Sequence, residues 1–328
     1  MQACLSHDDR RARAFLARRF PEAIEATMRD RFDLIVNEHD AILSAAELAA
    51  AAKGCRYLFV SATESLPSSL FDALAPELEV VGTLSVGYDH IAVDSAKAHG
   101  VSVLHTPDVL SEACAEIAMM LLLNAARRGY ESDALVRSGA WRGWGPTQLL
   151  GLELTGRRLA ILGMGRIGRE VAQRARGFGL QIHYHNRTRL PSELEAGANY
   201  HGDRESFLAH ADILLIAAPG TPALRGFLDR DAIAGLPADP IVVNISRGDI
   251  VDDDALIAAL QDGRVFAAGL DVFRDEPNID PRYRRLSNVF LSAHIGSATT
   301  RTRTAMGQLL LDGVAALQAG RRPANELT

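Results

Sequence analysis

The chain has little cysteine, and it lacks a long apolar segment. Its 3 cysteines, Cys4, Cys55 and Cys114, have no Cys-x-x-Cys or other paired metal spacing, so the sequence indicates neither a disulfide framework nor a zinc site. We expect three buried or inert thiols and no metal. Charged residues break every apolar run between Met1 and Phe20, which excludes a signal peptide, and no later run is long enough to span a membrane. The sequence therefore predicts a cytoplasmic protein without membrane association.

Lysine is also almost absent. Only Lys53 and Lys97 occur among the 35 basic residues, a bias that we attribute to genome composition and not to function. The formal net charge of −6 disfavours a nucleic-acid surface. With 328 residues, 48% hydrophobic and 23% charged, the chain is long enough to form two globular domains.

Two series of apolar strands and helical stretches follow each other. In the first, strands are expected at 33–36, 57–60, 79–81 and 101–104, with a helical stretch from Ser44 to Lys53, which predicts a small βα sheet. In the second, near-continuous apolar runs predict parallel strands buried on both faces, in a doubly wound Rossmann-type sheet of about six strands. These runs are 159–162, 180–185, 212–218, 240–246, 265–272 and 288–293. A helix from Ser111, its expected N-cap, to Arg128 links the two series, and a final helix is expected at 298–319.

A glycine motif follows the first strand of the second series. Gly163-Met164-Gly165-Arg166-Ile167-Gly168 has the Gly-x-Gly-x-x-Gly pattern, and a helical pattern continues from it. The first glycine allows a tight turn, the second a close approach of phosphates, and the third close packing of helix on strand. The motif predicts a dinucleotide site that includes Arg166 and Ile167; the alternative is a plain glycine turn.

The next strand ends in Asn186-Arg187-Thr188-Arg189, about twenty residues beyond the glycines. NAD enzymes usually keep an acidic residue there for the ribose 2′-hydroxyl. A guanidinium and a hydroxyl instead suit a 2′-phosphate, so the sequence favours NADP(H), with NAD(H) possible. The alternative is that Arg187 and Arg189 are solvated loop residues.

Polar residues follow three later strands at the edge where open α/β sheets bind ligands. They are Arg247, Glu276 and His294. An arginine, a carboxylate and a histidine beside a nicotinamide would suit reduction of a 2-oxo acid. Taken singly, the histidine is more often structural, and the arginine before Gly248 can be a turn residue.

With these motifs, the chain resembles the D-isomer-specific 2-hydroxyacid dehydrogenases, and within them the glyoxylate/hydroxypyruvate reductases. Besides the glycine motif, the matching segments are 85–90, 106–107, 244–248, 271–277 and 294–299. The resemblance implies NADPH-dependent reduction of a small 2-oxo acid to the D-2-hydroxy acid. Arg247 would hold the substrate carboxylate, His294 would be the general acid, and Glu276 would orient the imidazole and favour its protonated form.

The resemblance also implies further contacts. Backbone amides around Val86 and Gly87 would bind the substrate carboxylate, although the loop can also be a simple turn. Further cofactor contacts are implied at Ala218, Pro219, Thr221, Ile245, Ser246, Asp271, His294 and Gly296. Trp141 and Trp144 match a segment that lines the substrate pocket of a neighbouring subunit, which implies a homodimer; otherwise they are core or loop anchors.

The resemblance predicts a discontinuous domain layout. Residues 1–108 and the helix of 299–328 would form a flavodoxin-like βα substrate domain, into which the Rossmann domain of 109–298 is inserted. Two departures, Ala293 for proline and Cys114 for threonine, leave the catalytic groups in place and affect fine positioning.

The substrate itself stays open in the sequence. Alternatives are 2-ketogluconate, pyruvate, another 2-oxo acid, phosphite or formate. Formate is disfavoured because those relatives carry glutamine at the position of Glu276. A non-catalytic dinucleotide-sensing protein of the corepressor type shares the fold and remains a further alternative.

Overall fold

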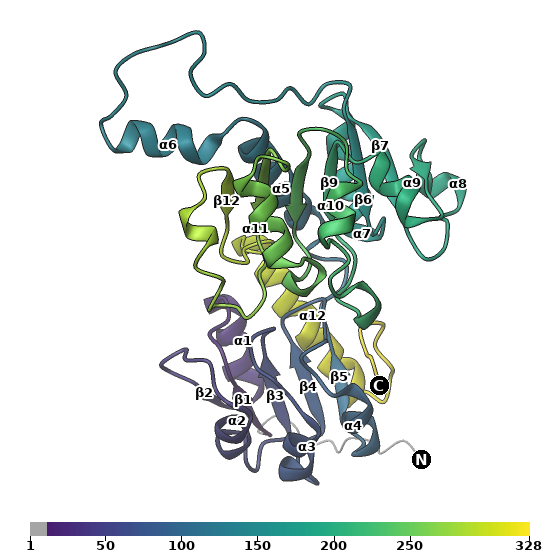
Figure 1. Cartoon of the computed structure of the whole chain (residues 1–328). Coiled ribbons are helices and arrows are strands. Elements are labelled where there is room, and N and C mark those ends of the chain that lie inside the picture. Colours follow the sequence, from purple (N-terminus) through teal and green to yellow (C-terminus); the bar gives the residue numbers. More distant parts are fainter. Residues whose placement is uncertain (1–11) are drawn as a thin grey trace. The chain divides into compact units, whose positions relative to one another are not determined.

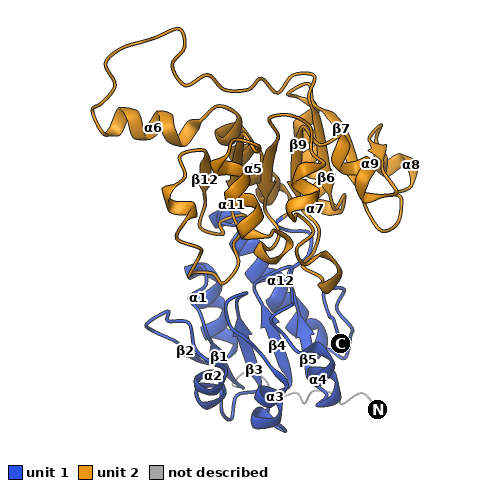
Figure 2. Ribbon diagram, in the orientation of Figure 1, with its two compact units in different colours: residues 1–110, 297–328 blue, residues 111–296 orange. Residues whose placement is uncertain are grey.

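The structure is a computed structural model that describes residues 12–328. Cys4 and most of the charged N-terminal residues that bear on the signal-peptide prediction lie outside the described residues. The chain forms two compact units (Figure 2): unit 1 contains the described residues up to Leu110 together with Ser297–Thr328, and unit 2 is Ser111–Gly296. Among residues 12–328, no helix is long and apolar enough to cross a lipid bilayer.

Unit 1 is built on five parallel strands in the order β2-β1-β3-β4-β5 (Figure 1), which is the flavodoxin-like order. The strands are β1 (Arg13–Leu16), β2 (Asp33–Val36), β3 (Tyr57–Val60), β4 (Val80–Thr83) and β5 (Ser102–Leu104). The helices are α1 (Glu22–Arg31), α2 (Ala45–Ala51), α3 (Ser68–Leu74), α4 (Val93–Ala98) and α12 (Thr300–Gln318). Residues of α1 and α12 pack on one face of the sheet, and residues of α2, α3 and α4 pack on the other.

The strand β1, which lies between β2 and β3 inside the sheet of unit 1, was not predicted from the sequence. Three of its four side chains are buried, but the strand is short and arginines stand on both sides of it, so no apolar run is visible in the sequence. The helical stretch expected from Ser44 is α2, whose N-cap Ser44 forms a capping box with Glu47.

Unit 2 contains seven strands in the order β12-β11-β10-β9-β6-β7-β8. All pair in parallel. Read from β8, this is the Rossmann order with one added strand. The strands are β6 (Arg158–Leu162), β7 (Gln181–His185), β8 (Asn199–Tyr200), β9 (Ile213–Ile216), β10 (Ile241–Asn244), β11 (Ala267–Leu270) and β12 (Val289–Leu291). The α/β prediction with an inserted Rossmann-type sheet is thus confirmed, but the estimate of six strands is one too low, because the two-residue β8 is too short to leave a pattern.

Helices cover both faces of the sheet in unit 2. Residues of α5 (Ser111–Ala126) and α7 (Arg166–Arg176) belong to one apolar core, and residues of α9 (Arg204–Ala209), α10 (Arg230–Ala234) and α11 (Asp253–Gln261) to the other. The remaining elements are α6 (Gly129–Arg137), α8 (Ser192–Glu195) and the 3₁₀ turns η2 (Pro222–Leu224), η3 (Gly248–Ile250) and η4 (Tyr283–Arg285).

The helix α5 begins at Ser111 as expected, but the expected N-cap role of Ser111 and the expected end at Arg128 were wrong. The helix already includes Ser111, so this serine is a first-turn residue and not the N-cap. It stops at Ala126, since Arg128 has a φ of 54°, outside the helical region. The last helix, α12, begins at Thr300, and the side chain of Thr299 caps it.

Candidate active site

The glycine motif connects β6 to α7 in unit 2. Gly163 has a φ of 95°, and a Cβ on it would lie 2.5 Å from the backbone nitrogen of Ala218. A Cβ on Gly168 would lie 2.4 Å from the carbonyl oxygen of Gly163, whereas one on Gly165 would meet no atom within 4 Å. The first and third glycines are therefore required by packing, and the second leaves open space at the start of α7.

This open space has the chemistry of a pyrophosphate site. The loop precedes α7, whose first turn contains Arg166 and Ile167, so the amide end of an eleven-residue helix borders it. The Asn186 side chain accepts a hydrogen bond of 2.7 Å from the Met164 amide, which fixes the middle of the loop. The residues present thus fit the diphosphate of a dinucleotide.

The two arginines of the segment after β7, Arg187 and Arg189, have different surroundings. Arg187 and Thr188 are exposed, while Arg189 forms an ion pair with Glu195, with 2.8 Å between Nε and Oε1. Among residues 12–328, no carboxylate pairs with Arg187. Arg187 therefore remains the candidate for a 2′-phosphate, and Arg189 stabilises its own loop.

The loops after β9 and β10 are joined by a hydrogen bond. The Ser246 hydroxyl, which is buried, donates to the carbonyl of Ala218. Pro219 and Thr221 are exposed beside it, and Ile245 is partly buried. Asn244 was not predicted as a site residue. Its side chain accepts a hydrogen bond from the Ser246 amide at 3.0 Å and donates one to the Arg247 carbonyl at 2.9 Å. A polar residue at the end of an apolar strand was its only signal.

Two glycines determine the surroundings of Arg247. A Cβ on Gly220 would lie 2.6 Å from Cγ of Arg247, so the arginine stem lies directly against that backbone. A Cβ on Gly248 would lie 1.9 Å from the carbonyl carbon of Phe273, so the loop after β10 touches the loop after β11. This contact brings Arg247 close to the segment that contains Glu276.

His294 and Glu276 form a hydrogen-bonded pair, with 2.7 Å between Nδ1 and Oε2. The other carboxylate oxygen of Glu276 accepts from the Phe273 amide, also at 2.7 Å. Because a carboxylate only accepts, Nδ1 of His294 carries hydrogen, and Nε2 is the atom left for a substrate. The His294 side chain is 42% exposed, so a small molecule can reach it.

Asp271 supports the backbone that follows His294. This carboxylate is 1% exposed and accepts from the amides of Ile295 and Gly296, each at 2.9 Å. His294 itself has a φ of 53°, which is uncommon for a residue with a side chain. The two hydrogen bonds hold this turn in place.

The environment favours the ionised form of Glu276. Burial raises the pKa of this carboxyl. The hydrogen bond and charge of His294, the Phe273 amide and the charge of Arg247 together lower it by more, so the pKa lies below that of an ordinary glutamate. Glu276 is therefore ionised at neutral pH, and Arg247 is near enough to act on it electrostatically.

The two cysteines among residues 12–328, Cys55 and Cys114, are not reactive thiols. Burial and, to a lesser extent, the charge of Asp271 raise the pKa of Cys114 to about 12. Its sulfur lies 3.2 Å from where a Cβ of Gly296 would be. Burial also raises the pKa of Cys55. Cys114 therefore packs beside the His294 turn as a neutral group.

The remaining site residues lie elsewhere in the fold. Val86 and Gly87 follow β4 in unit 1, and their amides donate to no other atom among residues 12–328. Trp141 and Trp144, in the long loop after α6, are 52% and 84% exposed, so they are not core residues.

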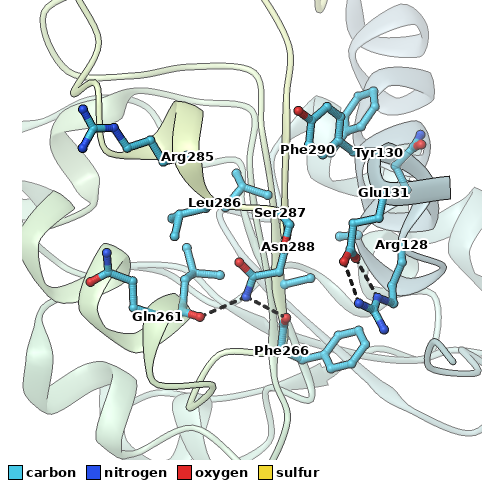
Figure 3. A pocket seen from close by; sticks show the side chains of 15 residues that line it. Arg128, Tyr130, Glu131, Gln261, Phe266, Arg285, Leu286, Ser287, Asn288 and Phe290 are labelled. Atoms are coloured by element: carbon cyan, nitrogen blue, oxygen red, sulfur yellow. Dashed lines mark hydrogen bonds and ion pairs between the residues drawn. The ribbon is translucent and has the colours of Figure 1, made fainter. Parts of the chain in front are cut away.

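A separate cavity of about 520 Å³ lies at the opposite edge of the sheet in unit 2 (Figure 3). It is lined by the first residues of β11 and β12, by Arg128, and by Tyr130 and Glu131 of α6. Arg128 is engaged by Glu131. The catalytic candidates follow the carboxyl ends of the strands, so this cavity is not part of their site.

Comparison with known proteins places the chain among 2-hydroxyacid dehydrogenases. The family described as D-isomer specific 2-hydroxyacid dehydrogenase, NAD binding domain, matches residues 119–296. A glycerate dehydrogenase of Hyphomicrobium methylovorum is 39% identical over 302 residues, which cover 92% of this chain and 94% of that protein.

Solved structures agree with this result. A Polaromonas protein, assigned to the NAD-binding D-isomer specific 2-hydroxyacid dehydrogenases, has a TM-score of 0.93 at 60% identity and covers 97% of this chain and 99% of its own. An NADPH-dependent glyoxylate/hydroxypyruvate reductase of Sinorhizobium meliloti, in complex with NADP and malonate, has a TM-score of 0.86 at 33% identity and covers 97% of each chain.

Proposed function

Because the chain belongs to the D-isomer-specific 2-hydroxyacid dehydrogenase family, and so is an oxidoreductase that uses a nicotinamide dinucleotide, we propose that it reduces glyoxylate or hydroxypyruvate with NADPH. The observation that carries this proposal is the hydrogen-bonded pair of His294 and Glu276, close to Arg247 and in the unit that carries the glycine loop. The same groups serve the reverse reaction, oxidation of glycerate or glycolate.

Arg247 binds the carboxylate of the 2-oxo acid in this proposal. A guanidinium fork can hold both carboxylate oxygens, and it can also polarise the neighbouring keto oxygen. The contact with Gly220 and the hydrogen bond of 2.9 Å from Asn244 to its carbonyl hold the start of the side chain.

His294 is the general acid. Its Nε2 delivers a proton to the keto oxygen, which becomes the hydroxyl of the product. A reduced nicotinamide, when bound, would supply the hydride that the carbon accepts. Glu276 keeps the ring in one orientation and one tautomer through Nδ1, and its negative charge balances the positive charge of the protonated ring. Asp271 keeps the turn of His294 in position, and it is also the proposed partner of the nicotinamide carboxamide.

The glycine loop and the loops after β7, β9 and β10 are the proposed binding site of the dinucleotide. The open space at Gly165 and the first turn of α7 would hold the pyrophosphate. Arg187 and Thr188 would bind the 2′-phosphate, supported by the absence of a carboxylate partner for Arg187 among the described residues. The loops that begin at Ala218 and Ile245 would flank the nicotinamide half.

Unit 1 corresponds to the proposed substrate domain, for which the sequence predicts the limits 1–108 and 299–328. Its loop at Val86 and Gly87 offers two backbone amides without an acceptor in the described part of the chain, and such amides bind carboxylates well. The exposed Trp141 and Trp144 belong to the proposed dimer contact.

An initial-rate panel tests the function. Glyoxylate, hydroxypyruvate, pyruvate and 2-ketogluconate are each offered with NADPH and with NADH, and oxidation of the cofactor is followed by absorbance. We expect the highest kcat/KM for glyoxylate or hydroxypyruvate with NADPH. Preference for pyruvate or 2-ketogluconate would replace the substrate assignment, and equal rates with NADH would remove the cofactor assignment. Binding of NADPH without turnover of any 2-oxo acid would favour a sensing protein instead.

A further inference from the structure

The loop after β4 in unit 1 is held by its carbonyl groups. The carbonyl of Ser85 accepts from the Thr106 amide at 2.9 Å, that of Val86 from Nδ1 of His105 at 3.0 Å, and that of Gly87 from the Ser85 hydroxyl at 2.7 Å. Three consecutive carbonyls are thus occupied, while the amides of Val86 and Gly87 have no acceptor within residues 12–328.

Among these three donors, His105 is the side chain that comes from outside the loop, because it follows the neighbouring strand β5. His105 is partly buried. Its ring meets Tyr88 edge-on, with centroids 5.8 Å apart and an interplanar angle of 88°. Because a carbonyl oxygen can only accept, Nδ1 carries hydrogen in both the neutral and the protonated ring. The contact with Val86 therefore does not depend on the charge of His105.

The backbone of His105 is fixed in turn by Asn325. The His105 amide donates to the carbonyl of Asn325 at 3.1 Å, and the Asn325 side chain donates to the carbonyl of His105 at 2.9 Å. Asn325 is only 4% exposed. The neighbouring Glu326 forms an antiparallel bridge with Leu104, so this segment continues the edge of the sheet and fixes the place of His105.

The Ser85 contact belongs to a second chain of hydrogen bonds. Since Ser85 gives its hydrogen to Gly87, it accepts from the Thr83 hydroxyl at 2.8 Å, and Thr83 accepts from Nε2 of His90 at 3.0 Å. Both ends of the loop are therefore held from inside unit 1.

We propose that His105 is a positioning residue, which holds the Val86 carbonyl so that the amides of Val86 and Gly87 remain available to the carboxylate of a 2-oxo acid. This inference rests on the proposed function. His105 makes no proton transfer itself, and it acts only through the backbone of the loop.

The test compares His105→Phe, which keeps the ring but loses Nδ1, with His105→Asn, whose amide nitrogen can take the place of Nδ1. We expect His105→Phe to raise KM for the 2-oxo acid, and the Ki of oxamate, by about threefold to tenfold, as for one lost hydrogen bond. The KM of NADPH and the pH profile of kcat should not change, and His105→Asn should restore most of the loss.

His99→Phe is the matched control. His99 also lies in unit 1 and also contacts a backbone carbonyl through Nδ1, that of Ser95 at 2.9 Å, but it does so at the C-terminal end of α4. It should leave the KM of the 2-oxo acid unchanged. An unchanged KM in folded His105→Phe, or a shifted pH profile, would overturn the proposal, and so would an equal effect of His99→Phe.

Ser85→Ala provides a second, smaller change in case His105→Phe does not fold. It frees the Gly87 carbonyl and should raise the same KM; an unchanged KM would overturn the mechanism. The wild-type protein separates this inference from the proposed function. If it reduces none of the four 2-oxo acids, the proposed function has failed, and calorimetric binding of oxalate decides the role of His105: an unchanged Kd in His105→Phe contradicts it, and a weaker Kd supports it.

Discussion

At the scale of single residues, backbone groups orient the acidic side chains around His294. Glu276 is fixed by the Phe273 amide, and Asp271 by the amides of Ile295 and Gly296. Each carboxylate therefore has a fixed direction before a substrate binds. This pre-organisation reduces the cost of orienting the proton donor in the reaction.

Replacing His294 by alanine tests its role as general acid. We expect kcat to fall by about 10² to 10⁴-fold, the usual contribution of a general acid, while the thermal midpoint stays within a few degrees of the wild type because the side chain is 42% exposed. Stopped-flow and steady-state rates with the best 2-oxo acid provide the measurement. His99→Ala is the control, and turnover near the wild-type rate in His294→Ala would remove the assignment.

Arg187→Asp tests whether Arg187 binds the 2′-phosphate of NADPH. A carboxylate at this exposed position would repel a 2′-phosphate but accept a hydrogen bond from a ribose hydroxyl. The ratio of kcat/KM for NADPH to that for NADH should therefore fall by about 10 to 100-fold, as expected from the loss of a charge-assisted hydrogen bond. Arg189→Gln serves as the comparison, since Arg189 is engaged by Glu195. A constant ratio in Arg187→Asp would mean that another group binds the phosphate.

The sequence could single out residues by their type and their position after a strand, but not by the partners that they meet in the folded chain. Arg247, Glu276 and His294 stand out because polar residues end apolar strands. Arg187 and Arg189 look equivalent in the sequence, and only the folded loop shows Glu195 beside one of them. His105 also follows an apolar strand, but its role could not be predicted, because its partner is a backbone carbonyl, a group that every residue has.

At the scale of elements, three histidines form a cluster. His183 lies in β7, His201 directly follows β8, and His210 directly follows α9. Nδ1 of His183 and Nε2 of His201 are 2.8 Å apart, and the ring of His210 stacks on His183 with centroids 5.1 Å apart. Burial lowers the pKa of His183 to about 4, helped by His201, His210 and Arg158 and opposed by Asp212. Burial and the charge of His210 likewise lower the pKa of His201.

This cluster predicts a loss of stability in mild acid. An unfolded histidine titrates near pH 6.5, so between pH 6.5 and 4 the unfolded chain binds a proton that folded His183 does not. Stability is therefore full above pH 6.5 and falls as the pH drops toward 4, by about 2 kcal/mol between pH 7.5 and 5.0 from this residue.

Urea unfolding of His183→Leu at these two pH values provides the measurement. The variant should lose about 2 kcal/mol less between pH 7.5 and 5.0 than the wild type does. His39→Leu, at an exposed position, should behave as the wild type. An equal loss in His183→Leu and the wild type would assign the acid sensitivity to other groups.

Element prediction from the sequence succeeded where a strand is a long apolar run and failed where packing alone forms it. The strands β6 and β10 are visible in the sequence because nearly all their residues are buried. In contrast, β1 is recognisable only once β2 and β3 pair with it. The two residues of β8 form a strand only because they pair with β7.

At the scale of the whole molecule, exposed apolar side chains concentrate in one part of the chain. Of the 11 large hydrophobic side chains that are exposed among residues 12–328, 5 lie between residues 130 and 150. They are Tyr130, Val136, Trp141, Trp144 and Leu150. This segment contains α6, which has no buried residue, and the long loop that extends away from the sheet of unit 2 (Figure 1). A monomer seldom exposes so much apolar surface in one segment, which supports the proposed homodimer.

The dimer can be tested by changing the charge of this segment. Sedimentation equilibrium of the wild type should give twice the chain mass of 35.4 kDa. The double variant Val136→Asp/Trp144→Asp places two carboxylates on surface that a dimer of standard size would bury, and it should sediment as a monomer with an unchanged thermal melt at low concentration. Phe178→Asp, at a residue 42% exposed outside the segment, is the control and should remain dimeric. A wild type that sediments as a monomer at micromolar concentration would contradict the proposed dimer, and a double variant that stays dimeric would assign the contact to another surface.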